Sequence, residues 1–242
     1  NGRRRQRQMC IRDRYTSGTT SNPKGCPLSH SNMMHATIAM MERWTISGKD
    51  VFWDPLPMFH MSSILPFSAC LMAKSEFIST VHFDPDQSIK VLEESEVSIA
   101  FPAFPAVMLA LVNHPDFSSS KLSKIRIINN VAPVDTLRSF QEALPNAKLV
   151  SAYGLTEASG VCSYGSPDDP LEKRITTSGK PFKGVKIRII HPETGEEVPA
   201  GEKGLIEISG PTVFKGYLND PAKTKETLSS DGWLSTGDFG SL

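Results

Sequence analysis

The sequence predicts an α/β fold, a parallel sheet with flanking helices, which is followed by a small β-rich subdomain. Short apolar runs alternate with helical segments between residues 51 and 152. Strands separated by helices of this length form βαβ units and a parallel sheet. From about residue 175, glycines and prolines come every few residues, and short alternating runs replace the helices. With 242 residues, 39% of them hydrophobic, the chain can bury a sizeable core.

The predicted elements follow a polar stretch at residues 15–25. A helix begins near 28–31, with Ser29 or Ser31 as its cap, and its apolar face recurs through residue 44. If this helix follows the polar stretch directly, its positive end faces the same ligand. The remaining strands are predicted at 51–53, 77–81, 97–101, 125–128 and 148–152, and the helices at 62–73, 86–96, 106–113 and 136–144. After 175, runs at 185–190 and 204–208 predict antiparallel strands.

Three polar segments come directly after predicted strands. His60 ends a proline-interrupted loop after the first strand, and residues 129–133 and 153–157 follow two later ones. Ligands of parallel sheets lie beyond the carboxyl ends of the strands, so these segments are candidates for a binding site. A lone histidine such as His60 is more often structural than functional.

The basic residues are unevenly distributed. Residues 1–14 hold six of the 26 basic residues and one of the 26 acidic ones, so the remainder carries 20 basic and 25 acidic residues. This tail is either a basic arm for nucleic acid or an anionic surface, or sequence foreign to the protein. The second interpretation is favoured, because residues 1–14 carry too many unpaired charges to form a buried strand. No nucleic-acid partner is expected for the acidic body.

The cysteines and the apolar runs indicate a compartment. Cys10, Cys26, Cys70 and Cys162 are scattered without a CxxC pair, which favours thiols in a reducing environment. No apolar run reaches about 18 residues, and no signal-peptide stretch opens the sequence. We therefore expect no transmembrane segment and a cytoplasmic location.

The stretch at residues 15–25 has the chemistry of an anion-binding loop. Thr19 and Thr20 offer hydroxyl donors, Lys24 offers a positive charge, and Gly18 and Gly25 let the backbone approach a ligand. The spacing is not that of a Walker A motif, which places Gly-Lys before Ser or Thr. A P-loop kinase or GTPase is therefore disfavoured.

Four segments in order resemble the acyl-adenylate-forming (AMP-binding) superfamily, in its acyl-CoA synthetase branch. They are the loop Tyr15-Thr16-Ser17-Gly18-Thr19-Thr20-Ser21-Asn22-Pro23-Lys24-Gly25, then Val131-Ala132-Pro133, then Tyr153-Gly154-Leu155-Thr156-Glu157, and last Gly232-Trp233-Leu234-Ser235-Thr236-Gly237-Asp238. The segments 201–206 and 216–219 also resemble sequences of this family. The resemblance covers roughly residues 15–242.

The resemblance implies part of a larger fold. Residues 15–174 are expected to form an α/β subdomain that binds the nucleotide and the acyl group. Residues 175–242 are expected to form a distorted barrel-like β subdomain that ends before the hinge. The resemblance implies that residues 1–242 do not include the C-terminal lid, which carries a catalytic lysine in this superfamily. Since losing one such donor costs about 10²–10³ in rate, we expect this fragment itself to be inactive.

The resemblance also implies a reaction and its residues. A carboxylate attacks the α-phosphorus of ATP to give acyl-AMP, and the acyl group then passes to CoA. Lys24, Thr156 and Glu157 are the expected catalytic residues, and Glu157 is the expected ligand of Mg²⁺. The expected nucleotide-binding residues are Thr16, Ser17, Gly18, Thr19, Thr20, Lys24, Val131, Ala132, Pro133, Ala152, Tyr153, Gly154, Thr156 and Asp238. Among them, Tyr153 is expected to stack on adenine and Asp238 to bind the ribose hydroxyls.

The acid substrate is indicated by the loop after the first strand. His60 stands where amino-acid-activating members place an aspartate, which favours a carboxylic acid without an α-amine, such as a fatty acid. Met58, Phe59 and Met61 either line an acyl pocket or pack in the core. Two alternatives stay open: a non-catalytic nucleotide-binding relic, favoured by Ser21 and Val131, and an amino-acid adenylation domain.

Overall fold

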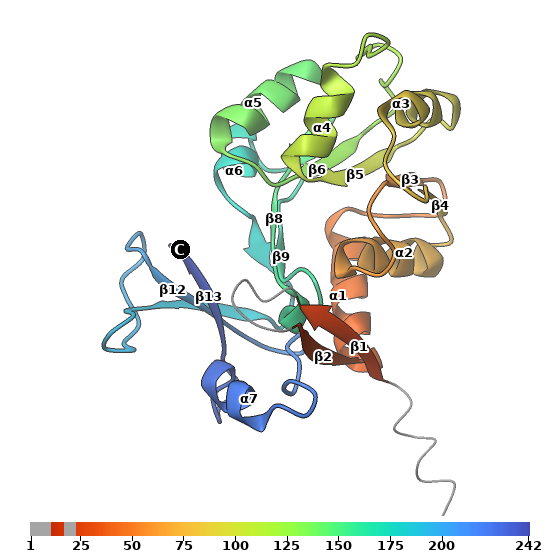
Figure 1. Cartoon of the computed structure of the whole chain (residues 1–242). Helices are drawn as coiled ribbons and strands as arrows, with labels where there is room; N and C mark the ends of the chain where they lie inside the picture. The colour runs from red at the N-terminus through yellow and green to blue at the C-terminus, as the bar shows by residue number, and fades with distance from the viewer. Residues whose placement is uncertain (1–10, 17–22) are drawn as a thin grey trace, which may run out of the picture. The chain divides into compact units, whose positions relative to one another are not determined.

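The chain forms two compact units, each built from separated segments of the sequence (Figure 1). The structure is a computed structural model that describes residues 11–16 and 23–242, with the backbone alone for 11–14. The first unit comprises residues 1–36, 154–162 and 181–242, and the second comprises 37–153 and 163–180. The expected division between residues 174 and 175 stays a prediction.

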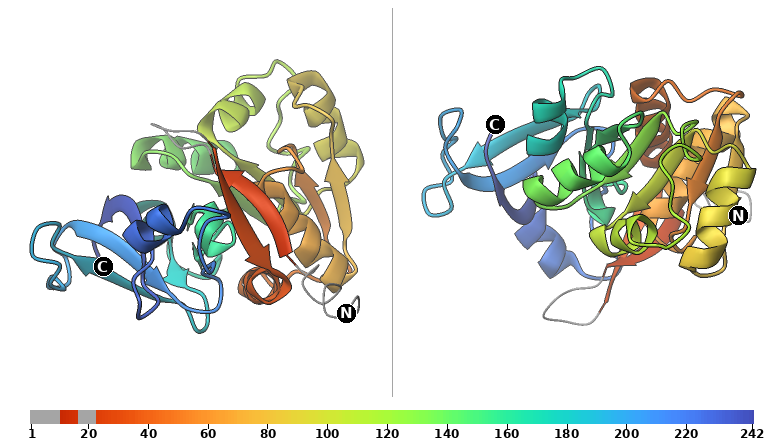
Figure 2. Two further views of the ribbon diagram at one scale, coloured as in Figure 1. Left: turned by 60° about the horizontal axis from the view of Figure 1, so that its bottom comes forward. Right: turned by 90° about the horizontal axis from the view of Figure 1, so that it is seen from above.

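The second unit contains the predicted parallel sheet, in the order β4-β3-β5-β6-β7. Its strands are β3 (Val51–Asp54), β4 (Glu76–Ser79), β5 (Ile99–Ala103), β6 (Ile127–Asn130) and β7 (Lys148–Val150). The helices between and after them are α2 (Met61–Ala73), α3 (Pro85–Glu94), α4 (Pro105–Val112), α5 (Val134–Ala143) and α6 (Leu171–Thr176). Figure 2 shows this sheet and its helices from two further directions. The strand order is that of a doubly wound fold, whose ligands bind at the carboxyl edge of the sheet.

Apolar side chains hold the helices against this sheet. Helices α3, α4 and α5 bury Ile89, Met108 and Phe140 against Trp53 and Leu149 of the strands. The rings of Tyr164, Trp44, Phe101 and Phe52 pack one on the next in this order, with neighbouring centroids 4.5–6.0 Å apart. Each fully buried side chain of this size contributes about 1.5–3 kcal/mol, so the unit has a substantial core.

The predicted elements from residue 51 to 144 are confirmed with ends that differ by at most two residues. The strand predicted at 148–152 was wrong, because it is two strands. β7 ends at Val150, whose carbonyl oxygen accepts a hydrogen bond from the Asn129 side chain at 3.1 Å. β8 (Ala152–Tyr153) joins β9 (Ser163–Tyr164) and β10 (Lys180–Pro181) in a separate small sheet. The amide of Asn129 thus takes the oxygen that a continuing ladder would use.

The first unit has the antiparallel strands that the sequence predicts. Its three-stranded sheet consists of β11 (Lys186–Ile190), β12 (Gly204–Ser209) and β13 (Leu234–Gly240). A hairpin joins β1 (Ile11–Thr16) to β2 (Lys24–Ser29), and the unit also holds the 3₁₀ turn η2 (Thr156–Ala158) and α7 (Pro221–Thr227). Residues 11–14, expected as part of a tail, therefore lie in a strand; whether they are native stays a prediction.

Helix α1 (His30–Arg43) begins in the first unit with the predicted cap. The Ser29 hydroxyl accepts the backbone N–H of Asn32 at 3.1 Å. The Asn32 side chain then donates to the carbonyl oxygens of Pro211 and Val213, at 2.7 and 3.0 Å. The condition that this helix follows the polar stretch directly is not met, since residues 26–29 of β2 lie between residue 25 and the start of the helix. Its amino end therefore does not follow the loop.

Three expected thiols are buried and form no disulfide bond: Cys26, Cys70 and Cys162. Burial raises the pKa of Cys70 to about 11 and that of Cys162 to about 12, which makes both poor nucleophiles at neutral pH. Cys10 lies outside the described residues. Among the helices of the described part of the chain, none is long and apolar enough to cross a bilayer.

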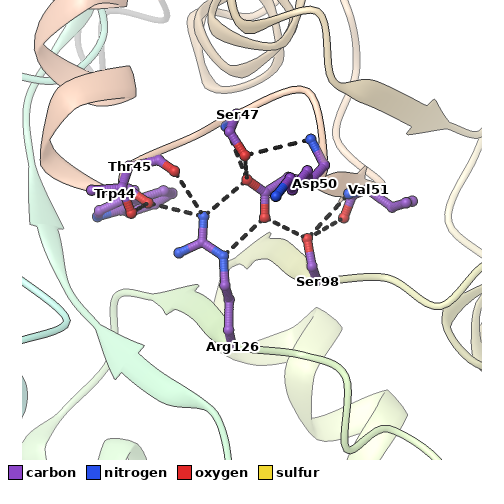
Figure 3. A network of polar contacts seen from close by, with 8 residues as sticks. Trp44, Thr45, Ser47, Asp50, Val51, Ser98 and Arg126 are labelled. Carbon is purple, nitrogen blue, oxygen red and sulfur yellow. Dashed lines mark hydrogen bonds and ion pairs between the residues drawn. The ribbon is translucent and has the colours of Figure 1, made fainter.

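A polar network ties together the amino ends of three strands of the parallel sheet (Figure 3). Arg126, just before β6, donates to both carboxylate oxygens of Asp50, just before β3, at 2.9 and 3.1 Å. Ser98, just before β5, donates to Asp50 at 2.8 Å. Burial alone would raise the pKa of Asp50, but the hydrogen bonds from Arg126, Ser98 and the Ser47 backbone outweigh it and lower that pKa. The network therefore stabilises the fold above the ordinary pKa of an aspartate, and this contribution is lost as the pH falls.

Arg126→Met is expected to lower the free energy of unfolding by about 2–3 kcal/mol, because it leaves the buried carboxylate of Asp50 without its cation. Denaturant unfolding at pH 7 measures this effect. The matched control is Arg138→Met, which removes an exposed ion pair to Glu172 and is expected to cost less than about 1 kcal/mol. Equal effects of the two substitutions would contradict the role of the network.

Candidate functional site

The hairpin of the first unit brings the two ends of the anion-binding loop together. Thr16, the last residue of β1, is paired with Lys24, the first residue of β2. The Thr16 hydroxyl oxygen is buried and has no hydrogen-bond partner among the described residues, so it is a candidate donor to a ligand. The predicted loop residues Ser17, Gly18, Thr19 and Thr20 lie outside the described residues, and their roles stay predictions.

A hollow of about 360 Å³ lies beside Lys24 in the same unit. Its lining comprises Tyr15, Pro23, Lys24, Gly25, Leu218, Asn219 and Asp220. This volume is within the range of small-ligand sites. The backbone N–H of Leu218 donates to the carbonyl oxygen of Gly25 at 2.8 Å, which fixes one wall of the hollow against β2.

Glu157, the predicted metal ligand, is buried at the centre of η2. Its backbone carbonyl accepts the N–H of Phe214 at 2.8 Å, and its carboxylate oxygen Oε1 accepts the hydroxyl of Tyr217 at 2.7 Å. The ammonium group of Lys24 lies 5.3 Å from the ring centroid of the same Tyr217. The structure thus brings two predicted residues, Lys24 and Glu157, to one tyrosine that the motif analysis left without a role.

The residues around Glu157 explain its fixed backbone. Gly154 has no room for a side chain, because a Cβ there would lie 2.4 Å from the carbonyl oxygen of Gly160. Ser159 ends η2 in the left-handed conformation, and its hydroxyl donates to the carbonyl of Thr212 at 2.7 Å. Thr156 begins η2 and is half-buried. Close packing therefore requires a glycine at position 154, and the predicted contact of Gly154 with the nucleotide stays a prediction.

Asp238, the predicted ribose ligand, lies exposed on β13 of the first unit. Its backbone N–H donates to the Thr236 hydroxyl at 3.1 Å, and that hydroxyl donates to the carbonyl of Ile206 on β12 at 2.9 Å. The strand therefore holds the backbone at Asp238 in place. Its role stays a prediction.

The second unit gathers the other predicted residues at the carboxyl edge of its parallel sheet. Val131, Ala132 and Pro133 follow β6, and the N–H of Val131 donates to the carbonyl of Ala103 at the end of β5. Ala103 itself has a φ of +48°, a strained conformation that clusters at ligand sites. Ala152 and Tyr153 form β8, one residue after β7 ends. The predicted nucleotide-binding residues are thus divided between the two units.

The loop after β3 presents His60 at the first turn of α2. His60 is exposed, and its ring lies 4.7 Å from that of Phe59, which is 69% exposed. Met58 is also exposed, and its sulfur accepts the Ser63 hydroxyl at 3.1 Å. Core packing, the alternative that the sequence left open, is therefore wrong for Met58 and Phe59, whereas Met61 is 5% exposed and does pack in the core. Their role in an acyl pocket stays a prediction.

Two buried polar residues lie at this edge: Asn130, which belongs to the predicted segment 129–133, and Asp54, which sequence reasoning missed. Both polar atoms of the Asn130 side chain, at the end of β6, have no hydrogen-bond partner among the described residues. Asp54, at the end of β3, is fully buried, and desolvation raises its pKa to about 8, opposed by hydrogen bonds from Leu56 and Ser63. An Asn pair and an Asp-Pro step are ordinary turn signals, so only tertiary burial distinguishes these two residues.

The site residues fit a magnesium ion that is held partly by the protein and partly by phosphate oxygens and water. Among the described residues, no group of three histidine, cysteine or acidic side chains could hold a metal by itself. Mg²⁺ prefers few carboxylates together with phosphate oxygens and water, so a single carboxylate such as that of Glu157 matches that preference.

Comparison with known proteins gives a consistent family. The family described as "AMP-binding enzyme" matches residues 14–218. The putative acyl-CoA synthetase YngI of Bacillus subtilis is 31% identical over 95% of this chain and 42% of its own length. The 4-coumarate-CoA ligase 1 of Narcissus pseudonarcissus is 33% identical over 93% of this chain and 43% of its own length. The chain thus spans less than half the length of these relatives.

Solved structures show the same similarity. ATP-bound MatB from Rhodopseudomonas palustris superposes with a TM-score of 0.87 and 30% identity, over 95% of this chain and 45% of that one. The O-succinylbenzoate coenzyme A synthetase MenE of Bacillus subtilis, in complex with AMP, gives a TM-score of 0.82 and 26% identity, over 95% of this chain and 46% of that one. The parallel sheet, the antiparallel strands and the ordered motifs agree with these matches. The chain belongs to the AMP-binding enzyme family.

Proposed function

We propose that the protein activates a carboxylic acid with ATP to form an acyl-AMP and then transfers the acyl group to CoA. The observation that carries this proposal is the contact of both Lys24 and Glu157 with Tyr217, together with the hollow that Lys24 lines. Relatives named as CoA ligases and structural neighbours with ATP or AMP support it.

In this proposal the chain's own residues lower the barrier to the reaction between two anions, the carboxylate and the polyphosphate. Lys24 and the hydroxyl of Thr16 bind the polyphosphate and offset its negative charge while the carboxylate approaches. Glu157 holds Mg²⁺, which neutralises phosphate charge when it is bound. Tyr153 and Val131–Pro133 bind the adenine, Thr156 the α-phosphate and Asp238 the ribose.

The proposed acid lacks an α-amine, as fatty and other non-amino acids do. His60 is exposed at the position where a partner for a substrate ammonium would be needed. Its imidazole carries no negative charge, so it cannot form that ion pair. Exposed Met58 and Phe59 beside it offer an apolar surface to an acyl chain or an aryl group. An amino-acid substrate is the less favoured proposal.

The test is acid-dependent release of AMP and pyrophosphate from MgATP by the native polypeptide that contains this chain. We expect release with fatty or aryl acids and none with amino acids, and thioester formation after CoA is added. Lys24→Met is expected to lower the rate by about 10²–10³-fold, as the loss of one electrostatic donor does. The exposed residue Lys203 provides the control, since Lys203→Met is expected to keep the wild-type rate.

Two results would contradict this proposal, each in a different way. Binding of ATP without release of AMP for any acid would favour the non-catalytic relic. Release with amino acids alone would contradict the proposed substrate class.

A further inference from the structure

Tyr217 occupies a fixed position between β12 and α7 of the first unit. Its backbone N–H donates to the Thr224 hydroxyl at 2.8 Å, and the next residue, Leu218, donates to Gly25 at 2.8 Å. The ring of Phe214 meets the Tyr217 ring edge-on, with centroids 4.9 Å apart. Backbone and side chain are therefore both held, so the ring presents one orientation.

Two groups of opposite charge contact this ring at different places. The Lys24 ammonium lies over the ring at 5.3 Å from its centroid, in the geometry of a cation–π contact. The hydroxyl at the ring's edge donates to Glu157 at 2.7 Å. Within the described part of the chain, no ion pair joins Lys24 directly to Glu157.

Direct pairing of these two groups would work against a site for polyphosphate and a cation. A lysine that is paired with a carboxylate attracts an incoming phosphate less strongly, and a carboxylate that is paired with a lysine binds a metal less well. The phenolic hydroxyl of Tyr217 is an uncharged donor, and it donates to Glu157 at 2.7 Å. A neutral aromatic donor satisfies the cation and the anion at once without neutralising either.

We propose that Tyr217 is a positioning residue that keeps Lys24 and Glu157 apart before the ligand binds, so that the lysine meets polyphosphate and the glutamate meets a divalent cation. The inference rests on the proposed function, because it assumes that these two groups bind those ligands. Tyr217 itself acts through Lys24 and Glu157.

The test compares Tyr217→Phe, Tyr217→Leu and the double variant Tyr217→Leu with Glu157→Gln, in the native polypeptide. Calorimetric titration of ATP, with and without Mg²⁺, gives the affinity and the Mg²⁺ concentration for half-maximal binding. Tyr217→Phe keeps the ring and is expected to raise that Mg²⁺ concentration about 10–100-fold, as the loss of a metal ligand's hydrogen-bond partner does. Its metal-free ATP affinity is expected to stay close to that of the wild type.

Tyr217→Leu removes the ring as well, so Lys24 is expected to pair with Glu157 and metal-free ATP binding is expected to weaken. Adding Glu157→Gln removes the partner that captures the lysine, so the double variant is expected to regain metal-free affinity. A purely structural role of Tyr217 would not produce this recovery. Tyr164→Phe, a buried tyrosine of the second unit, is the matched control and is expected to bind as the wild type does.

The outcomes separate the two proposals. Failure of the wild type to bind MgATP would overturn the proposed function and this inference with it. Wild-type binding together with an unchanged Mg²⁺ requirement in Tyr217→Phe would overturn the inference alone. Tyr217→Phe keeps the inference testable if Tyr217→Leu does not fold.

Discussion

Glu157→Gln is expected to lower the rate of acid-dependent AMP formation by about 10²–10³-fold at saturating ATP. Glutamine preserves the shape of the side chain, and its amide oxygen can still accept the Tyr217 hydroxyl. It removes the negative charge that a hard cation requires, so the loss is expected in the metal-dependent step rather than in folding. Initial rates of pyrophosphate release, measured across a Mg²⁺ series, report this directly.

The control for this prediction is Glu202→Gln, which changes an exposed turn residue of the same unit and is expected to leave the rate and its Mg²⁺ dependence unchanged. A thermal melt of each variant separates a loss of function from a loss of fold. If Glu157→Gln reaches the wild-type rate at every Mg²⁺ concentration, Glu157 is not the metal ligand.

Asp54→Asn is expected to stabilise the protein at pH 8 by about 2–4 kcal/mol. Desolvation holds the pKa of Asp54 near 8 in the folded state, against an ordinary value of 3.8. Below 3.8 the carboxyl is protonated in both states and costs nothing. Between 3.8 and 8 the unfolded state ionises while the folded state does not, so stability falls as the pH rises, with an upper bound of about 6 kcal/mol. Asparagine does not ionise, but its amide is also buried, which reduces the gain.

Denaturant unfolding at pH 5 and pH 8 tests this prediction, since the difference between variant and wild type must grow with pH. Asp168→Asn, which changes an exposed residue of the same unit, is the control and is expected to follow the wild type at both values. A constant difference between Asp54→Asn and wild type at the two pH values would show that Asp54 does not titrate in this range.

The alternation of apolar runs and amphipathic helices was enough to predict the parallel sheet, because both periods are local in the sequence. The division of the strand predicted at 148–152 was beyond local reasoning. It depends on the side chain of Asn129, which lies on a neighbouring strand and takes the Val150 oxygen. Competition for one hydrogen-bond acceptor is a property of the assembled sheet.

The candidate site shows the same limit. Motif order singled out Lys24 and Glu157, but their shared partner Tyr217 is 60 residues from Glu157 in sequence and lies in a turn-rich segment. Nothing in a Gly-Tyr-Leu-Asn string distinguishes a surface tyrosine from one that holds a buried carboxylate. Asp54 is similar, because an Asp-Pro step usually marks an exposed turn, whereas Asp54 is fully buried in the structure.

The discontinuous make-up of the units has a consequence for the order of synthesis. The parallel sheet of the second unit is complete once residue 150 has been made, whereas Tyr217 is synthesised almost 200 residues after Lys24. During translation the polypeptide therefore carries Lys24 and Glu157 for some time before Tyr217, which contacts both, has been made. Because domains fold as units when their residues emerge, we expect the sheet to form early and the polyphosphate site last. Ribosome-bound chains halted before residue 217 should then protect the sheet from proteolysis while leaving Glu157 without its partner.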